Sequence, residues 1–215
     1  MKNIVSSAPE WHTFSTQEQL SEYQKNQFQS YADLLVEWSQ KISITTITDP
    51  SSIVLDHFQD SVYVTHFLDF THVRGIADIG SGGGFPGIPL AIFFPEKPLY
   101  LIEVNEKKIA FLHEVVRRLS LNNVTIYPFD WRTFLRKTAY DIDVFCSRAS
   151  LPIHELLRVL KPSSPYKESV LVYWASRYWQ LEEYERSFFI GEKSYTLGTK
   201  KRRYIFFAQH EIAFK

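Results

Sequence analysis

The glycines of this chain are concentrated in one short segment. The sequence has only eight glycines; six of them fall between Gly75 and Gly87, and five of these six lie in the stretch ADIGSGGGFPGIP. An apolar, strand-like run precedes this stretch, and PGIPLAIFF follows it as the start of a helix. Glycines at such a turn permit positive φ and let the backbone approach a ligand beneath the partially positive helix N-terminus. The segment therefore predicts a ligand-binding loop.

Two kinds of ligand fit a loop of this form. The letters GGGFPG match the G-x-G-x-x-G of a dinucleotide site, a pattern that is weak on its own. The longer stretch from Asp78 to Gly84 matches D-x-G-x-G-x-G, the pattern of S-adenosylmethionine (SAM) methyltransferases. A carboxylate two residues before the turn disfavours the negative pyrophosphate of a dinucleotide, whereas it favours the sulfonium and ammonium groups of SAM. The charge pattern favours SAM.

Glu103 supplies a second part of the predicted site. It ends the strand-like run LYLIEV, 19 residues after Gly84. A carboxylate at the end of the second strand can accept hydrogen bonds from both hydroxyls of a ribose. Because either cofactor needs such a group, Glu103 predicts a nucleoside without choosing between the two.

Beyond Gly75 the sequence alternates between strand and helix patterns. The predicted strands are GIADIG, PLYLIEV, NVTIYP, DIDVFCSRA and ESVLVYWA, with helical patterns between them. This alternation predicts an α/β fold with a mostly parallel sheet and helices on both faces. After residue 175 we expect a helical piece over ASRYWQLEEYERSF and then a hairpin that turns at Gly198.

The first 70 residues have a different, all-helical pattern. Apolar positions over residues 15–40 recur at helical spacing, and Ser15 or Thr16 could cap a single amphipathic helix there. A second helix is predicted to begin at Asp49 and Pro50. We therefore expect an N-terminal helical extension over residues 1–70 and a SAM-binding domain over residues 71–215.

Composition excludes several classes of protein. With 45% apolar and 22% charged residues, the chain is neither disordered nor fibrous. No apolar run approaches the ~18 residues needed to span a bilayer, and the N-terminus lacks the apolar core of a secretion signal. The single Cys146 permits no internal disulfide or cysteine-rich zinc site, and we expect it in the core. We expect a cytoplasmic monomer without a membrane or metal partner.

The charge balance is neutral overall but uneven along the chain. Residues 1–75 hold 4 basic and 9 acidic residues, whereas residues 151–215 hold 11 basic and 7 acidic residues. A polyanionic partner should therefore meet the C-terminal two-thirds of the chain. The candidate basic clusters are Lys107-Lys108, Arg117-Arg118, Arg132 with Arg136-Lys137, and Lys200-Lys201-Arg202-Arg203.

From about Tyr31 to Pro162 the sequence resembles the RsmG (GidB) family of methyltransferases. The matching stretches are LLVEWSQKISITTITDP, LDHFQDSV, ADIGSGGGFPGIPLAIFFP, KKIAFLHEVVRRLSLNNVTIY and SRASLPIHELLRVLKP. The FPGIP continuation of the glycine loop, together with an upstream H-F-x-D-S, separates this family from other SAM enzymes. The resemblance implies a class I SAM-dependent methyltransferase, Rossmann-like, that methylates guanine N7 in 16S ribosomal RNA of the small subunit.

The resemblance also implies SAM contacts at Gly80, Phe85, the pair Trp131-Arg132, and Arg148. Combined with the residues argued above, the candidate cofactor-binding residues are Asp78, Gly80, Gly82, Phe85, Glu103, Trp131, Arg132 and Arg148. Three places depart from the family pattern. Trp131-Arg132 stands where the family has a small residue and an acid, and Trp174-Ala175 stands where it has lysine and glycine. Ser43 stands where the family has asparagine.

Guanine N7 carries a free lone pair, so its methylation requires no general base, and we assign no catalytic residue. His57 and Asp60 lie one helical turn apart and either line the cleft or form a satisfied buried pair. Two other functions remain open, a SAM enzyme acting on a small molecule and a divergent, non-catalytic module that binds SAM or RNA. Methyl transfer assays separate these alternatives.

Overall fold

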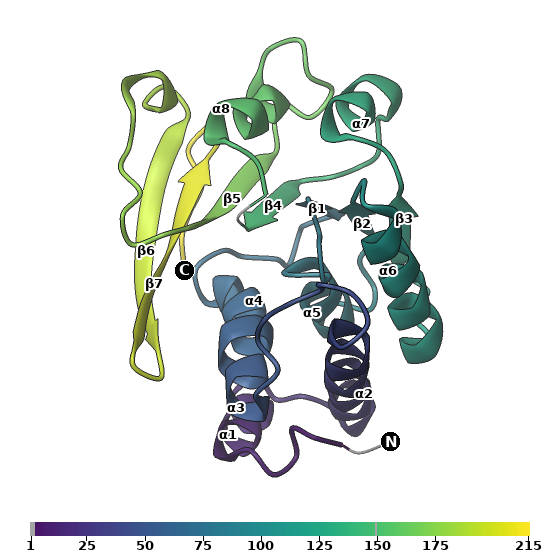
Figure 1. Ribbon diagram of the computed structural model, residues 1–215. Coiled ribbons are helices and arrows are strands. Elements are labelled where there is room, and N and C mark those ends of the chain that lie inside the picture. The colour runs from purple at the N-terminus through teal and green to yellow at the C-terminus, as the bar shows by residue number, and fades with distance from the viewer. Residues whose placement is uncertain (1–2, 149) are drawn as a thin grey trace.

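A seven-stranded sheet forms the centre of the protein (Figure 1). The structure, a computed structural model, describes residues 3–148 and 150–215. The strands are β1 (Ile76–Ile79), β2 (Leu99–Ile102), β3 (Val124–Tyr127), β4 (Val144–Arg148), β5 (Val170–Ala175), β6 (Phe189–Leu197) and β7 (Lys200–Phe207). Their order is β3-β2-β1-β4-β5-β7-β6. The first five strands are parallel, and β7 runs antiparallel to β5 and β6.

The five strands predicted from the alternation are all present, which confirms the mostly parallel α/β sheet. Ala149, the last residue of the predicted strand DIDVFCSRA, lies outside the described residues. The hairpin is also confirmed, because β6 and β7 are joined at Gly198, whose φ is +56°.

Helices cover both faces of the sheet, as predicted (Figure 1). Those after β1 are α5 (Gly87–Phe93), α6 (Glu106–Leu119), α7 (Trp131–Lys137) and α8 (Ile153–Leu156), with the short helical turns η3 (Leu157–Leu160) and η4 (Glu183–Glu185). Successive strand residues alternate between two cores, since side chains of a strand point alternately to opposite faces. Ile76 joins the core with the N-terminal helices, and Ala77 joins the core with α7 and α8.

The N-terminal helices pack on one face of the sheet in the same hydrophobic core as α5 and α6. They are α1 (Pro9–Gln17), α2 (Glu22–Ser39), α3 (Pro50–Ser52), the π-helical stretch η1 (Ile53–Gln59), α4 (Asp60–Val62) and η2 (Tyr63–His66). The division into an extension and a SAM-binding domain stays a prediction. No helix of residues 3–148 and 150–215 is long and apolar enough to cross a membrane.

The single helix expected over residues 15–40 is wrong, because the chain breaks between α1 and α2. Gln19 has a left-handed φ of +51°. Ser21 then caps α2 in a reciprocal arrangement, in which the Gln24 amide N donates to Ser21 Oγ at 3.2 Å and the Ser21 amide N donates to Gln24 Oε1 at 3.0 Å. Such a capping box satisfies two backbone donors at a helix start and therefore defines a new N-terminus.

The helix that begins at Pro50 is present as predicted, and Asp49 Oδ2 accepts a hydrogen bond from the Ser52 amide at 2.8 Å. The helical piece expected after residue 175 is wrong. Among its described residues only η4 is helical. The Arg203 guanidinium of β7 donates to the carbonyls of Ser176 and Trp179, which removes acceptors that a helix would use.

Candidate functional site

The glycine loop lies directly after β1, at the carboxyl edge of the sheet. The φ angles of Gly80, Gly82 and Gly84 are +70°, +59° and +90°, a region that side chains rarely adopt. At Gly80 space is also lacking, because a Cβ there would lie 2.3 Å from Ser150 Cβ. The loop thus needs glycine for both conformation and close approach.

Asp78 lies beneath the loop and holds its far end. Its Oδ2 accepts a hydrogen bond from the Gly87 amide at 2.9 Å, and its carbonyl accepts one from Ser81 Oγ at 3.0 Å. Asp78 is fully buried, and its Oδ1 has no hydrogen-bond partner among the described residues. Burial raises the pKa of Asp78 to about 7, although the Gly87 amide and Arg148 oppose this change.

Glu103 connects the end of β2 to the glycine loop. Its Oε2 accepts a hydrogen bond from the Gly82 amide at 2.7 Å, and its Oε1 accepts from the amides of Val104 and Asn105, each at 2.9 Å. Three backbone donors hold this carboxylate in one orientation. Each oxygen of an ionised carboxylate has two lone pairs, so Oε2 retains one for a ligand hydroxyl.

A pocket of about 570 Å³ opens beside Gly80 and Glu103. It is lined by Ile79, Gly80, Ile102, Glu103, Val104, Lys108, Asp130, Trp131, Arg132, Ser150, Leu151 and Glu155. The chain runs outward from β1 to β2 and β3 and then returns to β4 on the other side of β1. Ligands of α/β proteins bind at such a switch point, and the volume is typical of small-molecule sites.

Trp131 and Arg132 form the wall of this pocket at the start of α7. Asp130 caps the helix by accepting a hydrogen bond from the Thr133 amide at 3.0 Å. The Trp131 indole N–H donates to the Glu155 carbonyl at 3.1 Å, and Arg132 Nε donates to Glu155 Oε2 at 3.0 Å. Glu155 of α8 thus places a carboxylate beside Arg132, which stands where the family has an acid.

Four of the eight candidate residues line the pocket, namely Gly80, Glu103, Trp131 and Arg132. Asp78 supports the loop from below by accepting a hydrogen bond from the Gly87 amide. Gly82, within the loop, donates its amide hydrogen bond to Glu103. Sequence reasoning missed Ser150 and Glu155. The close approach of Gly80 to Ser150 could not be found from the sequence, since it depends on how β1 and the segment after β4 meet.

Phe85 and Arg148 belong to a second cluster, on the side of the loop that faces the N-terminal helices. The Phe85 ring stacks on His57 with 4.0 Å between centroids, and the Arg148 guanidinium lies 5.0 Å from the centre of the Phe85 ring. Arg148 Nη1 donates to the Asp56 carbonyl at 2.9 Å and to Asp60 Oδ2 at 3.2 Å. Arg148 therefore connects the end of β4 to η1 and α4.

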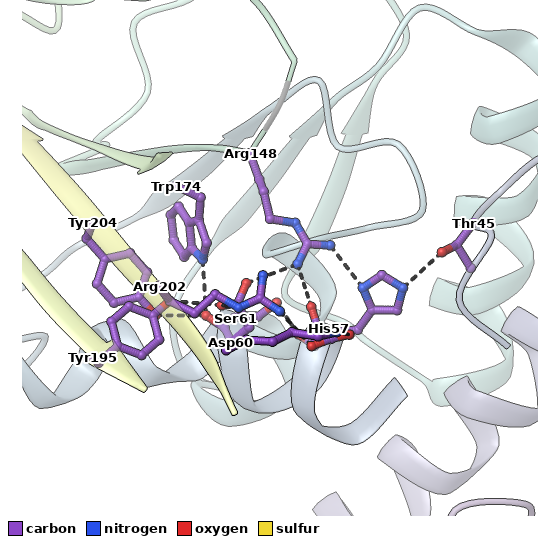
Figure 2. Close-up of polar contacts among 11 residues, drawn as sticks. Thr45, His57, Asp60, Ser61, Arg148, Trp174, Tyr195, Arg202 and Tyr204 are labelled. Atoms are coloured by element: carbon purple, nitrogen blue, oxygen red, sulfur yellow. Dashed lines mark hydrogen bonds and ion pairs between the residues drawn. The ribbon is translucent and has the colours of Figure 1, made fainter. Parts of the chain in front are cut away.

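Asp60 is the centre of a buried polar cage (Figure 2). Its Oδ1 accepts a hydrogen bond from the Tyr195 hydroxyl at 2.9 Å. Its carbonyl accepts from Trp174 Nε1 at 3.1 Å and from the Tyr204 hydroxyl at 2.8 Å. Burial raises the pKa of Asp60, whereas Arg148 and Arg202 oppose this. Trp174, the second departure from the family pattern, thus holds α4 against the sheet.

His57 is satisfied and buried, which was one of its two interpretations. It is 5% exposed and contacts Thr45 Oγ1 through Nε2 at 3.0 Å and Arg148 through Nδ1 at 3.1 Å. Burial, assisted by Arg148, lowers the pKa of His57 to about 3. Cys146 lies fully buried in β4, as expected, and burial raises the pKa of its thiol.

The basic clusters differ in how much of their charge is already paired. Arg117 and Arg118 both contact Glu114 on α6. In the candidate cluster Lys200–Arg203, Lys200 and Arg202 pair with buried Asp56 at 2.5 and 2.6 Å. The hairpin thus uses two of these four cations to hold η1, and contact of the cluster with RNA stays a prediction.

Solved structures of low sequence identity share the fold. The METTL16 MTase domain has a TM-score of 0.61 at 12% identity, covering 96% of this chain and 94% of that chain. A SAM-dependent O-methyltransferase from Thermotoga maritima has a TM-score of 0.55 at 13% identity, covering 83% and 72%. The sheet is therefore that of the class I SAM methyltransferases, as predicted.

Proteins named Ribosomal RNA small subunit methyltransferase G have similar sequences. The protein from Thermoanaerobacter sp. is 34% identical over 161 residues, which cover 74% of this chain and 65% of the relative. The protein from Desulfitobacterium hafniense is 39% identical over 146 residues, covering 67% and 60%. The alignments thus span less than two thirds of these relatives' own lengths.

The family match covers most of the chain. Residues 24–205 match the family described as GidB, rRNA small subunit methyltransferase G. This range contains the glycine loop, Glu103, the pocket wall at α7 and the cage around Asp60. The chain therefore belongs to the GidB family, rRNA small subunit methyltransferase G, as its resemblance indicated.

Proposed function

We propose that this chain is a SAM-dependent methyltransferase that acts on guanine N7 in 16S ribosomal RNA of the small subunit. One observation carries the proposal, namely the pocket at the switch point of a class I sheet, which is lined by Gly80 of the glycine loop and by Glu103. Family membership supports ribosomal RNA as the substrate.

The pocket residues fit SAM in shape and charge. Gly80 lines the pocket, and its lack of a Cβ lets Ser150, another lining residue, approach the loop. Glu103 is held by three amides, and its Oε2 retains one lone pair that can accept from a ligand hydroxyl. Trp131 also lines the pocket and is 5% exposed, so a small part of its indole is open to contact with an adenine. When bound, SAM supplies an electrophilic methyl group on a positively charged sulfur.

The remaining tasks of the protein are alignment and exclusion of water. Guanine N7 presents a lone pair at neutral pH, so no side chain has to remove a proton before transfer. His57 fits this proposal, because it is buried, neutral and engaged by Thr45 and Arg148. Rate enhancement then rests on holding the two reacting atoms in line at short distance.

The decisive test is methyl transfer from labelled SAM to small ribosomal subunits that lack the modification. We expect incorporation at one guanine, mapped by its altered cleavage chemistry. Subunits that already carry the methyl group are the matched control and should accept none. Incorporation into a metabolite extract alone would favour a small-molecule enzyme. SAM binding without transfer to any acceptor would favour a non-catalytic module.

A further inference from the structure

A basic hollow of about 420 Å³ lies at the end of β5, beside the β6–β7 hairpin. It is lined by Ala175, Arg177, Glu192, Ser194, Tyr195, Thr196, Lys201, Arg202 and Arg203. Four lining residues are cationic and one is acidic. The expected helix after β5 is absent from the described residues, and the chain between β5 and β6 is mostly irregular.

The alternation of β7 assigns its four basic residues to two faces. Side chains of neighbouring strand residues point to opposite faces of a sheet. Lys200 and Arg202 point toward the N-terminal helices and pair with Asp56, and Figure 2 shows Arg202 beside Asp60. Lys201 and Arg203 occupy the other face, opposite Thr196 and Ser194 of β6.

Lys201 and Arg203 lie on the face of the hairpin that points away from the N-terminal helices. Among the described residues, Arg203 has a carboxylate partner and Lys201 has none. Arg203 donates to the Ser176 carbonyl at 2.9 Å and lies 3.4 Å from Glu192 Oε1. Lys201 is exposed and forms no ion pair with any residue of 3–148 or 150–215. Arg177, also exposed, likewise has no carboxylate partner in these ranges. Its guanidinium donates a hydrogen bond to the Tyr178 hydroxyl and lies 4.6 Å from the ring centre of Tyr178. Tyr178 is itself 76% exposed.

The hollow lies near the candidate methyl-transfer site. Arg148 of β4 is paired with Trp174 of β5, and the next residue, Ala175, is paired with Arg203 of β7. Neighbouring strands are about 4.8 Å apart, so the hollow is roughly 10 Å from the end of β4 and roughly 14 Å from the glycine loop after β1. This places it within reach of nucleotides that adjoin a base inserted at the carboxyl edge.

We propose that this hollow binds the phosphate backbone of the RNA substrate, next to the target nucleotide, through Lys201 and Arg177. Both cations are exposed and have no carboxylate partner among the described residues, which suits them to replace the counterions of phosphates. The Arg177 guanidinium covers one face of the exposed Tyr178 ring, and the other face offers a stacking surface for an adjacent base. This inference rests on the proposed function, but it assigns RNA contact to two residues and removes it from Lys200 and Arg202, which hold the fold together.

The test compares cations on the two faces of the same hairpin. Lys201→Ala and Arg177→Ala each remove a proposed phosphate contact, whereas Lys193→Ala is the matched control. Lys193 is paired with Tyr204, on the face opposite Lys201, and its ammonium lies 4.8 Å from the Phe214 ring centre. Binding to unmodified small subunits is measured over a range of salt concentrations, and SAM affinity is measured by calorimetry.

We expect each proposed contact to contribute about 0.7–0.9 to the slope of log K against log salt. The slope should therefore fall by about that amount in Lys201→Ala and in Arg177→Ala, and by about twice that amount in the double variant. Lys193→Ala should keep the wild-type slope, and all variants should keep wild-type SAM affinity. Equal slopes in Lys201→Ala, Lys193→Ala and wild type would overturn the inference. Failure of the wild-type protein to bind or methylate any small subunit would instead overturn the proposed function.

Discussion

His57 Nδ1 accepts a hydrogen bond from Arg148 Nη2 at 3.1 Å, and this contact fixes the tautomer of the histidine. A guanidinium can only donate, so Nδ1 must carry the lone pair and the ring proton must be on Nε2. Nε2 then donates to Thr45 Oγ1 at 3.0 Å. Protonation of Nδ1 would place two donors against each other in a buried site, which agrees with a pKa lowered to about 3.

The free energy of unfolding should fall as the pH is lowered, because His57 is buried in its neutral form. Its pKa is about 3 in the folded protein and 6.5 in the reference state, so the unfolded chain binds the extra proton between these values. The stabilising contribution of neutral His57 is complete above pH 6.5 and is lost as the pH falls toward 3. The slope is at most about 1.4 kcal/mol per pH unit. Urea unfolding of His57→Gln, which can keep both hydrogen bonds, should lack this slope.

Asp78 should produce the opposite slope over nearly the same range. Its pKa is raised from 3.8 to about 7, so the folded protein holds a proton that the unfolded chain releases. This contribution is complete below pH 3.8 and is lost as the pH rises through 7. In the wild type the two slopes should largely cancel between pH 4 and 6.5. Asp78→Asn should therefore lose stability in acid more steeply than wild type, and parallel curves for the two proteins would contradict the prediction.

Asp60→Asn should lower the free energy of unfolding more than Tyr195→Phe, which removes a single hydrogen bond to the Asp60 carboxylate. Asp60 is 1% exposed and faces Arg148 at 3.2 Å and Arg202 at 3.7 Å. Removal of one partner from a buried ion pair costs about 3–5 kcal/mol. The matched control, Tyr195→Phe, removes one hydrogen bond to Asp60 Oδ1 and should cost about 1 kcal/mol. Equal costs in urea unfolding would mean that Asp60 is already neutral in the folded protein.

Local signals in the sequence predicted the five parallel strands, the C-terminal hairpin and four of the twelve residues that line the pocket. The glycine loop and Glu103 are adjacent in one strand–helix–strand unit, so their meeting follows from the order of elements alone. The departures at Arg132 and Trp174 were visible as changes, but their partners were not. Glu155 and the Asp60 carbonyl come from helices 23 and 114 residues away from them.

The two wrong helix predictions share a physical cause. Apolar residues recur at helical spacing over residues 15–40 and after residue 175. This spacing does not show which side chains bind the backbone groups that a continuous helix would use for its own hydrogen bonds. Ser21 and Gln24 end the first pattern through local capping. Arg203 ends the second from 27 residues away, by binding the Ser176 carbonyl. The competing partner is local in the first case and distant in the second, and in both cases it overrides the helical spacing.

Glu103→Gln should weaken SAM binding by roughly one to two orders of magnitude, because a hydrogen bond to a charged group contributes about 1.5–3 kcal/mol. The amide group of glutamine also offers one acceptor where the carboxylate offers two to Gly82, Val104 and Asn105. Calorimetry on Glu106→Gln provides the control, since Glu106 is exposed in the first turn of α6 and does not line the pocket. Equal affinities in the two variants would show that Glu103 does not bind the ribose.

Gly80→Ala should abolish SAM binding through two separable effects. A Cβ at Gly80 would lie 2.3 Å from Ser150 Cβ, and the φ of +70° adds strain for any side chain. The strain alone costs about 1–2 kcal/mol, whereas the clash requires the segment after β4 to move. Ser150→Gly removes the opposing carbon, so Gly80→Ala/Ser150→Gly should recover part of the affinity by calorimetry. Gly82→Ala isolates strain, because the nearest atom to its Cβ would be 3.8 Å away and φ is +59°. If the double variant binds no better than Gly80→Ala, the close approach of Gly80 to Ser150 is not what requires glycine there.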